Sequence, residues 1–431
     1  MKEKYIVDSK ITNEFVEAFT KTTYRIIGKN KHSAIKPCHW LEQRLLTGRD
    51  NRNCYKGIFG IQSHRCLQNT PSLPFCNHQC VFCWRDIENG SLGSEFAVEP
   101  DDPKEIIEEM IRHQQDIITN HLTLKRYLDN YEIMKDILYY MLTNEEPQNI
   151  YSLSKNIRIS KNKIERALTL LKNQKFISVI DSKLNSIKIE PDIKKCINSR
   201  DEIEQLINRE LTTPDEIIQT HNQALYPNHA AISLDGEPLL YPRISEFVEE
   251  FRNRKMTTFI VTNSTLPERI NSLTAFPSQL YLTLPASNEQ IYKKICRPMV
   301  KDGWKRIMET MESIESLSCR TLVRLTAVKD LNIKEDDKLI KDYLKIIENA
   351  NPNFFEIKGF TLQASALLIN ERLKSNEPIN YYFPEYLYLK NIAKQFEELG
   401  NFPLIFENEV SRDFLFAVNW QKDKDPKITI P

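Results

Sequence analysis

The sequence predicts an α/β protein, in which a partial (βα)6 barrel of the TIM type carries a small inserted α+β domain. Three observations support this prediction. Strand-like and amphipathic helical stretches alternate beyond residue 213, and this alternation is typical of a parallel sheet. Residues 121–212 follow a different order, in which helices precede two short strands. The composition, 41% hydrophobic and 27% charged, is that of a globular protein.

The predicted barrel elements follow one another along the chain. After a first strand, an amphipathic helix is expected over 101–118, with Pro103 near its start and acidic residues in its first turn. The next strand begins at His229 and ends in an Asp-Gly turn. Further strands are expected at Thr257–Asn263, Leu280–Leu284, Thr321–Val328 and Phe354–Phe360, and helices at Arg243–Arg254, Trp304–Ile314 and Asp337–Asn349. In such barrels the site lies at the carboxyl ends of the strands.

The inserted segment has the element order of a winged helix. Helical spacing is expected at Glu132–Leu142, Ile150–Asn156 and Lys161–Gln174, and Phe176–Ile189 alternates like a two-stranded wing. The predicted domains are therefore an N-terminal segment over 1–75, a barrel formed by 76–120 and 213–431, and the insertion at 121–212.

The insertion is locally basic. From Ile150 to Ile189, nine basic residues face two acidic ones, a net charge of +7: Lys155, Arg158, Lys161, Lys163, Arg166, Lys172, Lys175, Lys183 and Lys188 against Glu165 and Asp181. Such a patch can hold phosphates, or it can be a solvated helical face that packs on a partner. Both interpretations remain open from the sequence.

Charge and composition exclude several classes of protein. Lys plus Arg and Asp plus Glu both number 59, so no globally basic coat for nucleic acid exists. Neither GxGxxG nor GxxxxGK[ST] occurs, which argues against dinucleotide and P-loop sites. No window offers 18 uncharged apolar residues and the first residues lack an apolar signal region, so we expect a cytoplasmic protein without a membrane span.

Cysteine spacing is the strongest signal of chemistry. Six of the nine cysteines fall within 46 residues. A large chain without an export signal favours reduced thiols that bind metal over a disulfide framework. Cys76, Cys80 and Cys83 form a CxxxCxxC loop. A structural zinc site prefers four ligands, whereas a 4Fe-4S cluster held by three thiolates keeps one iron free for another ligand.

The loop CNHQCVFC, with the aromatic Phe82 before its last cysteine, resembles the radical S-adenosylmethionine superfamily. The resemblance implies that Cys76, Cys80 and Cys83 hold a 4Fe-4S cluster whose free iron binds the amino and carboxylate groups of S-adenosylmethionine. One electron then cleaves the sulfonium and yields a 5'-deoxyadenosyl radical. A zinc loop is the alternative.

Two further segments resemble cofactor-binding positions of this superfamily. Gly236 and Glu237 match its GGE segment, whose backbone and carboxylate receive the cofactor ammonium, although Asp235 replaces the first glycine. Asn263 matches a third-strand position that contacts ribose or carboxylate, although Ser264 stands where glycine commonly follows. A plain strand-end turn is the alternative for the first segment.

The upstream run, KPCHW, CYKGIFGIQSHRC and QNTPSLPFCNHQCVFCWR, resembles the 4-demethylwyosine synthases of wybutosine biosynthesis, which modify tRNA-Phe. The resemblance implies a second 4Fe-4S cluster on Cys38, Cys54 and Cys66, and a Schiff base between Lys56 and pyruvate. A lysine is nucleophilic only when neutral, and burial or a nearby cation lowers its pKa toward that state. Many relatives carry a second lysine where this chain has Ile58. Structural cysteines and a surface lysine are the alternatives.

Three basic side chains beside the expected clusters have open roles. His64, Arg65 and Arg85 could clamp a carboxylate or tune a cluster by hydrogen bonding to sulfur.

The implied function is a radical lyase that converts 1-methylguanosine beside the anticodon of tRNA-Phe, with pyruvate, into 4-demethylwyosine. The adenosyl radical takes hydrogen from the N-methyl group, the carbon radical attacks pyruvate, and formate leaves as the ring closes. Electrons would come from a separate ferredoxin or flavodoxin. Two alternatives are a radical enzyme on the same scaffold that acts on another nucleoside or small molecule, and a non-catalytic iron–sulfur redox sensor that binds nucleic acid.

Overall fold

The computed structural model describes residues 5–20, 24–48, 54–144, 146–173, 175–179, 186–195, 197–421 and 424–429. The chain divides into two compact units. The larger comprises 1–37, 52–114 and 227–431, and the smaller comprises 38–51 and 115–226. The smaller unit thus joins the insertion to a short segment that the sequence analysis grouped with the N-terminal region. The domain limits given above stay predictions.

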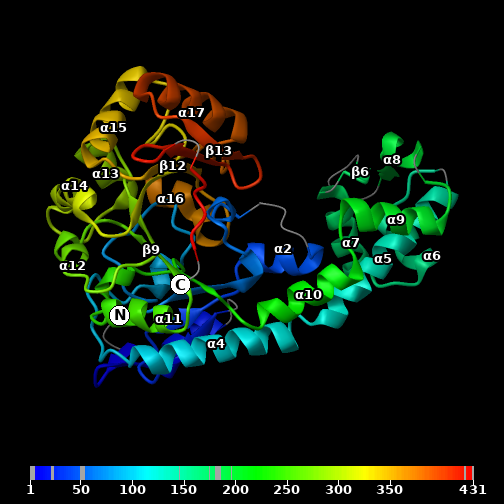
Figure 1. The fold of residues 1–431 in the computed structure, drawn as a ribbon, viewed down its shortest axis with the longest axis horizontal. Coiled ribbons are helices and arrows are strands. Elements are labelled where there is room, and N and C mark those ends of the chain that lie inside the picture. The colour runs from blue at the N-terminus through cyan, green and yellow to red at the C-terminus, as the bar shows by residue number, and fades with distance from the viewer. Residues whose placement is uncertain are drawn as a thin grey trace. The chain divides into compact units, whose positions relative to one another are not determined.

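Six parallel strands form the centre of the larger unit (Figure 1). They are β5 (Cys66–Thr70), β8 (His229–Ile232), β9 (Thr257–Thr262), β10 (Gln279–Thr283), β11 (Arg320–Ala327) and β12 (Phe354–Gly359), paired in that order. This arrangement confirms the predicted six βα units. The predicted bounds of β9 to β12 are correct to within one residue.

Antiparallel strands extend the sheet to ten on both sides. The strands β14 (Asp413–Ala417) and β13 (Leu404–Asn408) follow β12, and β4 (Ser33–Ile35) and β3 (Arg25–Ile27) follow β5. The strands β3 and β13 lie at the two edges of this sheet and do not pair with each other, so the sheet does not close into a complete barrel. The sequence analysis did not predict these four strands or the hairpin of β1 (Ile6–Val7) and β2 (Lys10–Ile11).

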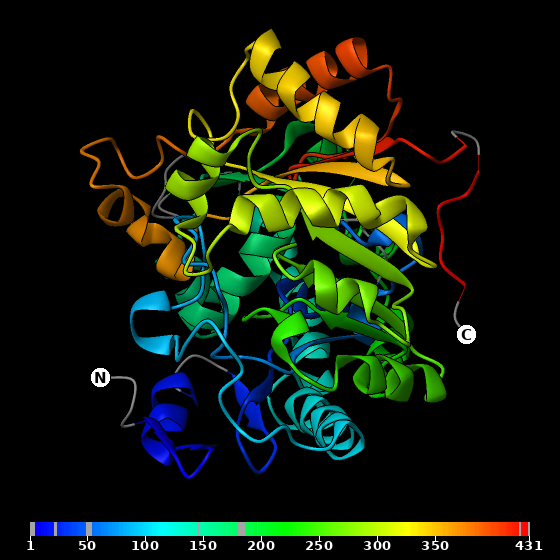
Figure 2. The ribbon, with the colours of Figure 1, turned by 90° about the vertical axis from the view of Figure 1, so that its left-hand side faces the viewer.

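Helices of the larger unit lie on the outer side of its strands (Figure 2). Amphipathic stripes such as Ile340, Leu344 and Ile347 of α15 are buried, as a surface helix requires. The helices are α1 (Asn13–Thr20), α3 (Ile87–Gly90), α4 (Pro103–Asn120), α11 (Ile244–Asn253), α12 (Pro267–Asn271), α13 (Glu289–Cys296), α14 (Gly303–Ser313), α15 (Asp337–Ala350), α16 (Ile369–Leu373) and α17 (Tyr386–Gly400). Short 3-10 turns are η2 (Gly57–Phe59), η3 (Ser63–Arg65), η4 (Pro238–Leu240), η5 (Ile314–Ser316) and η6 (Ala364–Leu368).

In the smaller unit, α5 (Leu124–Thr143) packs against α2, α6, α7, α9 and α10. The other elements are α2 (His39–Thr47), α6 (Ile150–Ile157), α7 (Lys161–Asn173), β6 (Ile177–Val179), β7 (Ile187–Ile189), α8 (Pro191–Lys195), α9 (Arg200–Glu210) and α10 (Pro214–Ala224). The β6–β7 hairpin follows α7, and a bridge joins Gln148 to Ile187. The assignment of a winged helix to this insertion stays a prediction. Asn149 caps α6 by accepting a hydrogen bond from the Ser152 N–H at 2.8 Å. Lys183 and Asp181 of the basic segment lie outside the described residues.

Candidate active site

The loop after β5 holds Cys76, Cys80 and Cys83 at the carboxyl end of the first parallel strand, as predicted. Backbone hydrogen bonds fix the loop: the Cys76 N–H donates to the Gly93 carbonyl at 2.9 Å, and the Cys83 N–H to the Cys80 carbonyl at 3.1 Å. The Val81 N–H donates to the carbonyl of Ile295 on α13 at 2.9 Å. All three thiols are half-buried. Phe82 is also partly buried, and its contact with cofactor stays a prediction.

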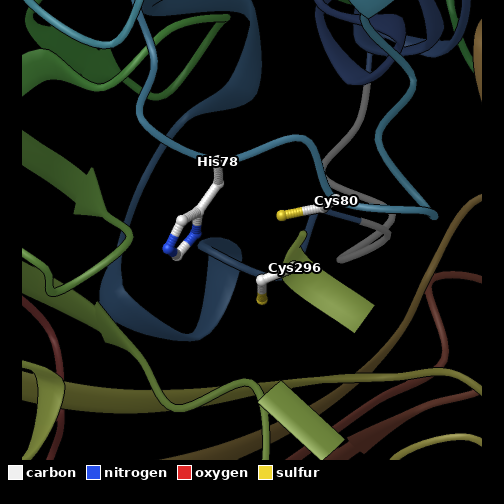
Figure 3. A group of neighbouring side chains, drawn as sticks. All are labelled: His78, Cys80 and Cys296. Atoms are coloured by element: carbon white, nitrogen blue, oxygen red, sulfur yellow. The ribbon is translucent and has the colours of Figure 1, made fainter. Parts of the chain in front are cut away.

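Burial dominates the electrostatics of these thiols. It raises the pKa of both Cys76 and Cys83 to about 12, against the opposing charge of Arg85. Cys80 has different neighbours, since its Sγ lies with His78 and Cys296 in a group whose ligand atoms are all within 4.8 Å of one another (Figure 3). A hydrogen bond with Cys296 raises the pKa of Cys80 well above its ordinary value. Cys296, at the end of α13, is a thiol to which the sequence analysis assigned no role.

The turn after β8 touches the cysteine loop directly. Gly236 has φ +78°, and a Cβ there would lie 2.0 Å from the Ser72 carbonyl oxygen, so only glycine fits. The Glu237 N–H donates to the Phe75 carbonyl at 2.8 Å, and the Ser72 hydroxyl donates to the Glu237 carbonyl at 2.8 Å. The preceding Asp235 is buried and accepts a hydrogen bond from the Tyr24 hydroxyl at 2.5 Å.

The Glu237 carboxylate is buried, and its oxygens accept hydrogen bonds from neighbouring residues of the chain. It accepts hydrogen bonds from the Thr262 hydroxyl at 2.7 Å and from the backbone N–H groups of Asn263 at 2.7 Å and Leu239 at 3.1 Å. Burial nevertheless raises its pKa. The carboxylate thus joins the turn to the end of β9, and its predicted contact with a cofactor ammonium stays a prediction.

Asn263 follows β9 and reaches the cysteine loop. Its Nδ2 donates to Asn77 Oδ1 at 2.6 Å and lies 4.0 Å from Cys76 Sγ. Its Oδ1 accepts hydrogen bonds from the N–H and the hydroxyl of Thr265, at 3.1 and 2.6 Å. The next residue, Ser264, is fully buried with φ +64°, a left-handed conformation that suits glycine better than serine.

Arg85 provides a test of whether an iron–sulfur cluster fits here. The side chain is only 4% exposed, and its Nε and Nη2 have no hydrogen-bond partner among the described residues. Its charge acts on Cys76, Cys83 and Asp235. Three soft thiol ligands with a buried, partly unpartnered guanidinium beside them suit an anionic cluster, because thiolates are the ligands that such clusters prefer.

A second group of predicted residues meets at the other end of β5. Cys66 begins that strand, and Cys54 and Lys56 lie close enough to it to shift one another's pKa values. The Cα atoms of Cys66 and Thr70 are about 13 Å apart along this strand, and the cysteine loop follows its far end. Cys38 belongs to the smaller unit, where it precedes α2. The structure therefore brings together Lys56 and two of the three expected ligands, and the complete ligand set stays a prediction.

Lys56 is buried rather than on the surface, with 5% of its area exposed. The expected lowering of its pKa is wrong for the chain as described. Burial alone lowers the pKa, but the charges of Tyr55, Cys66 and Cys54 outweigh it and raise the value above the ordinary one.

Charged residues line the barrel interior near Lys56, and the sequence analysis assigned them no role. Arg324 on β11 pairs with Glu356 on β12, and Lys358 pairs with Asp413 on β14 at 2.6 Å. Each is a charged residue within an otherwise apolar strand, a signal that could have marked them as interior site residues. His229, at the start of β8, is buried, and burial lowers its pKa to about 3.

Comparison with known proteins places this arrangement in a class. Residues 194–343 match the model of the radical SAM superfamily. The match begins after most of the insertion and therefore omits the cysteine loop itself. The fold and the three-thiol loop at the carboxyl end of β5 together define a radical S-adenosylmethionine enzyme, which uses S-adenosylmethionine and a 4Fe-4S cluster.

Relatives narrow the class to one family. The chain is 34% identical to the S-adenosyl-L-methionine-dependent tRNA 4-demethylwyosine synthase of Pyrococcus horikoshii over 351 residues, which cover 80% of this chain and 74% of the relative. It is 30% identical to the Xenopus laevis enzyme, with 84% of this chain and 35% of that protein covered. The chain belongs to the tRNA 4-demethylwyosine synthase family, which sets aside a non-catalytic role.

Solved structures share the fold. A structure of TYW1 with a lysine-pyruvate adduct bound has a TM-score of 0.61 at 22% identity, with 97% of this chain and 99% of that chain covered. The crystal structure of an archaeal TYW1 gives a TM-score of 0.57, also at 22% identity. Within the described residues, no helix has the length and hydrophobicity needed to cross a bilayer.

Proposed function

We propose that this protein converts 1-methylguanosine next to the anticodon of tRNA-Phe, together with pyruvate, into 4-demethylwyosine. The observation that carries the proposal is the family membership combined with a buried Lys56 beside Cys54 and Cys66. A lysine enclosed in this way can react with a carbonyl compound away from bulk water.

The chain's own residues would provide one group that holds pyruvate and another that binds S-adenosylmethionine. The amine of Lys56 attacks the central carbon of pyruvate, a C–N bond forms and water leaves, and the resulting Schiff base holds the keto acid in the barrel. The Tyr55 hydroxyl, hydrogen-bonded to that amine, orients it. Gly236, Glu237 and Asn263 would bind S-adenosylmethionine, and Phe82 would pack against it.

Iron–sulfur clusters would complete the site. Cys76, Cys80 and Cys83 would hold the cluster that supplies, with S-adenosylmethionine, the radical that takes hydrogen from the N-methyl group. We propose a second 4Fe-4S cluster on Cys38, Cys54 and Cys66, and a separate ferredoxin or flavodoxin as electron donor. Measuring the iron and sulfide content under anaerobic conditions tests whether both clusters are present. About eight irons per chain would support two clusters, and about four would rule out the cluster on Cys38, Cys54 and Cys66.

Binding of tRNA is the second part of the proposal. Exposed lysines on and around α7 present a basic face whose aromatic neighbour Tyr151 is 61% exposed, with Lys161 Nζ 3.7 Å from its ring centre. We propose that this face contacts the tRNA backbone, since lysines bind phosphates by charge.

Product analysis tests the function. Anaerobically reconstituted enzyme, a chemical reductant, S-adenosylmethionine, pyruvate and tRNA-Phe carrying 1-methylguanosine should yield 4-demethylwyosine, detected by mass spectrometry of the digested tRNA. Lys56→Ala should lose this product while it still cleaves S-adenosylmethionine, because the cysteine loop is untouched. Cleavage of S-adenosylmethionine without a change in the tRNA would instead point to another nucleoside or small molecule as substrate.

A further inference from the structure

Three cations surround the ring of Tyr55 inside the barrel. The centre of this ring lies 4.9 Å from Lys56 Nζ, 4.5 Å from Arg324 Cζ and 4.6 Å from Lys358 Nζ. Arg324 also lies over Tyr281, at 4.5 Å from that ring centre. Each cation is therefore held against an aromatic face, which is a favourable position for a desolvated charge.

Two of these three cations are paired with carboxylates. Glu356 accepts from Arg324 Nε, and Asp413 accepts from Lys358 Nζ at 2.6 Å. Among the described residues, no carboxylate pairs with Lys56. Each of the two carboxylates is thus engaged by Arg324 or Lys358, and the charged neighbours of Lys56 are the thiols of Cys54 and Cys66 rather than a carboxylate.

Arg324 has an unused hydrogen-bond donor. Its side chain is only 7% exposed, and Nη2 has no acceptor within hydrogen-bonding distance in the described part of the chain. A buried N–H of a charged group is costly to leave unpaired. The Glu356 carboxylate fixes Nε and so leaves the Nη edge as the part of the guanidinium that a ligand can meet.

We propose that Nη2 of Arg324 binds the carboxylate of the 2-keto acid that Lys56 holds, with Glu356 as the positioning residue. The proposal rests on the proposed function, since it assumes the adduct at Lys56. A 2-keto acid carries its carboxylate one bond from the reacting carbonyl carbon, so the group that receives the carboxylate must lie near the amine. The Tyr55 ring brings the two side chains into one neighbourhood, since its centre lies 4.9 Å from Lys56 Nζ and 4.5 Å from Arg324 Cζ. A guanidinium is well suited to a carboxylate because the hydrogen bond is charge-assisted.

Borohydride trapping tests the proposal without radical chemistry. Hydride reduces the C=N bond of the Schiff base to a stable secondary amine, and peptide mass spectrometry reports the adduct on Lys56. The wild type should trap pyruvate at lower concentration than methyl pyruvate, a keto ester without the charge. Replacing Arg324→Gln and Glu356→Gln together should raise the half-saturating pyruvate concentration about 10- to 100-fold, the effect of one charge-assisted hydrogen bond, and leave methyl pyruvate unchanged. The double replacement is used because the single one would leave a buried carboxylate unpaired.

Two further variants test whether the guanidinium of Arg324 itself is needed. Arg324→Lys keeps the positive charge beside Glu356 but lacks the Nη2 donor, and it should weaken pyruvate trapping less than the double replacement. Arg320→Gln is the matched control, since Arg320 lies on the same strand and also contacts aromatic rings, but donates to the Pro426 carbonyl at 2.6 Å and to Gln279 at 2.8 Å. It should leave the preference for pyruvate intact.

The outcomes separate this proposal from the function on which it rests. A double variant that keeps the wild-type preference for pyruvate overturns the role of Arg324. Loss of the preference in Lys358→Gln alone would do the same and assign the carboxylate to that lysine. Wild-type protein that traps neither compound on Lys56 overturns the Schiff base itself and the proposed function with it.

Discussion

Gly236→Ala should uncouple the cofactor turn from the cysteine loop. The new Cβ would lie 2.0 Å from the Ser72 carbonyl oxygen, so the two backbones must separate by about 1 Å to reach the closest distance that real Cβ atoms show. A residue with a Cβ at φ +78° costs about 1–2 kcal/mol. The separation also weakens the two 2.8 Å hydrogen bonds between these segments, each worth about 1 kcal/mol. We expect the free energy of unfolding to fall by about 3–4 kcal/mol.

The functional effect should exceed the loss of stability. Because Cys76 follows Ser72 and Phe75 within the same loop, a shift of about 1 Å misplaces a cluster ligand, and misplacement of that size can cost about 100-fold in rate. The assay is anaerobic cleavage of S-adenosylmethionine per bound iron, together with urea unfolding of the same preparation.

A control variant separates backbone strain from the clash. Gly60 has a similar φ of +82°, but a Cβ there would meet only the flexible Lys427 side chain, at 3.3 Å. Gly60→Ala should therefore lose about 1–2 kcal/mol and keep normal cleavage of S-adenosylmethionine. Equal effects of the two substitutions on stability and cleavage would refute the reasoning.

Three further predictions concern strain, protonation and tRNA binding. Ser264→Gly should stabilise the protein by about 0.5–1 kcal/mol in urea unfolding, because it relieves a left-handed, fully buried serine whose hydroxyl has no partner among the described residues; a loss of stability would show that the strain is absent. Burial lowers the pKa of His32 to about 4, so the unfolded chain binds more protons between that value and about 6.5 and the stability is lost as the pH falls through this window. His32→Asn should flatten the dependence of the unfolding free energy on pH in this window by up to about 1.4 kcal/mol per pH unit, and an unchanged slope would contradict the assignment. Replacing Lys155, Lys161, Lys163 and Lys172 by Gln should reduce the slope of log affinity for tRNA against log salt by about 0.9 for each phosphate that the variant no longer binds, whereas Lys194 and Lys195 on α8 serve as controls; an unchanged slope would remove the basic face from tRNA binding.

Local patterns account for what the sequence analysis predicted correctly. The strands β9 and β10 are apolar runs bounded by polar residues, and β11 and β12 are largely apolar apart from Arg324, Glu356 and Lys358. A sheet buried on both faces imposes this pattern on each strand separately. The cysteine loop is equally local, since eight consecutive residues carry all three thiols. The strands β3 and β4 are only three residues long, and such short segments carry no reliable period.

Other features depend on residues that are distant in the chain. The requirement for glycine at position 236 comes from the backbone of Ser72, and the proximity of Cys80 to Cys296 joins a loop to the end of α13. The pKa of Lys56 follows from a balance between burial and neighbouring charges, and the sequence analysis considered burial and nearby cations but not the groups of Tyr55, Cys66 and Cys54 that raise the pKa.

The amino-acid sequence by itself determined the βα order, the three-thiol loop and the lysine beside the upstream cysteines, because each of these is a property of consecutive residues. Only the tertiary structure decided that Arg324 and Lys358, paired with Glu356 and Asp413, meet Lys56 around the ring of Tyr55. The physical reason is that parallel pairing of β11 with β12, and antiparallel pairing of β12 with β14, align side chains from three separate segments on the interior face of one sheet. Burial makes an unpaired N–H of a charged group costly, and the unpaired Nη2 of Arg324 is the reason why we propose this residue as a binding group.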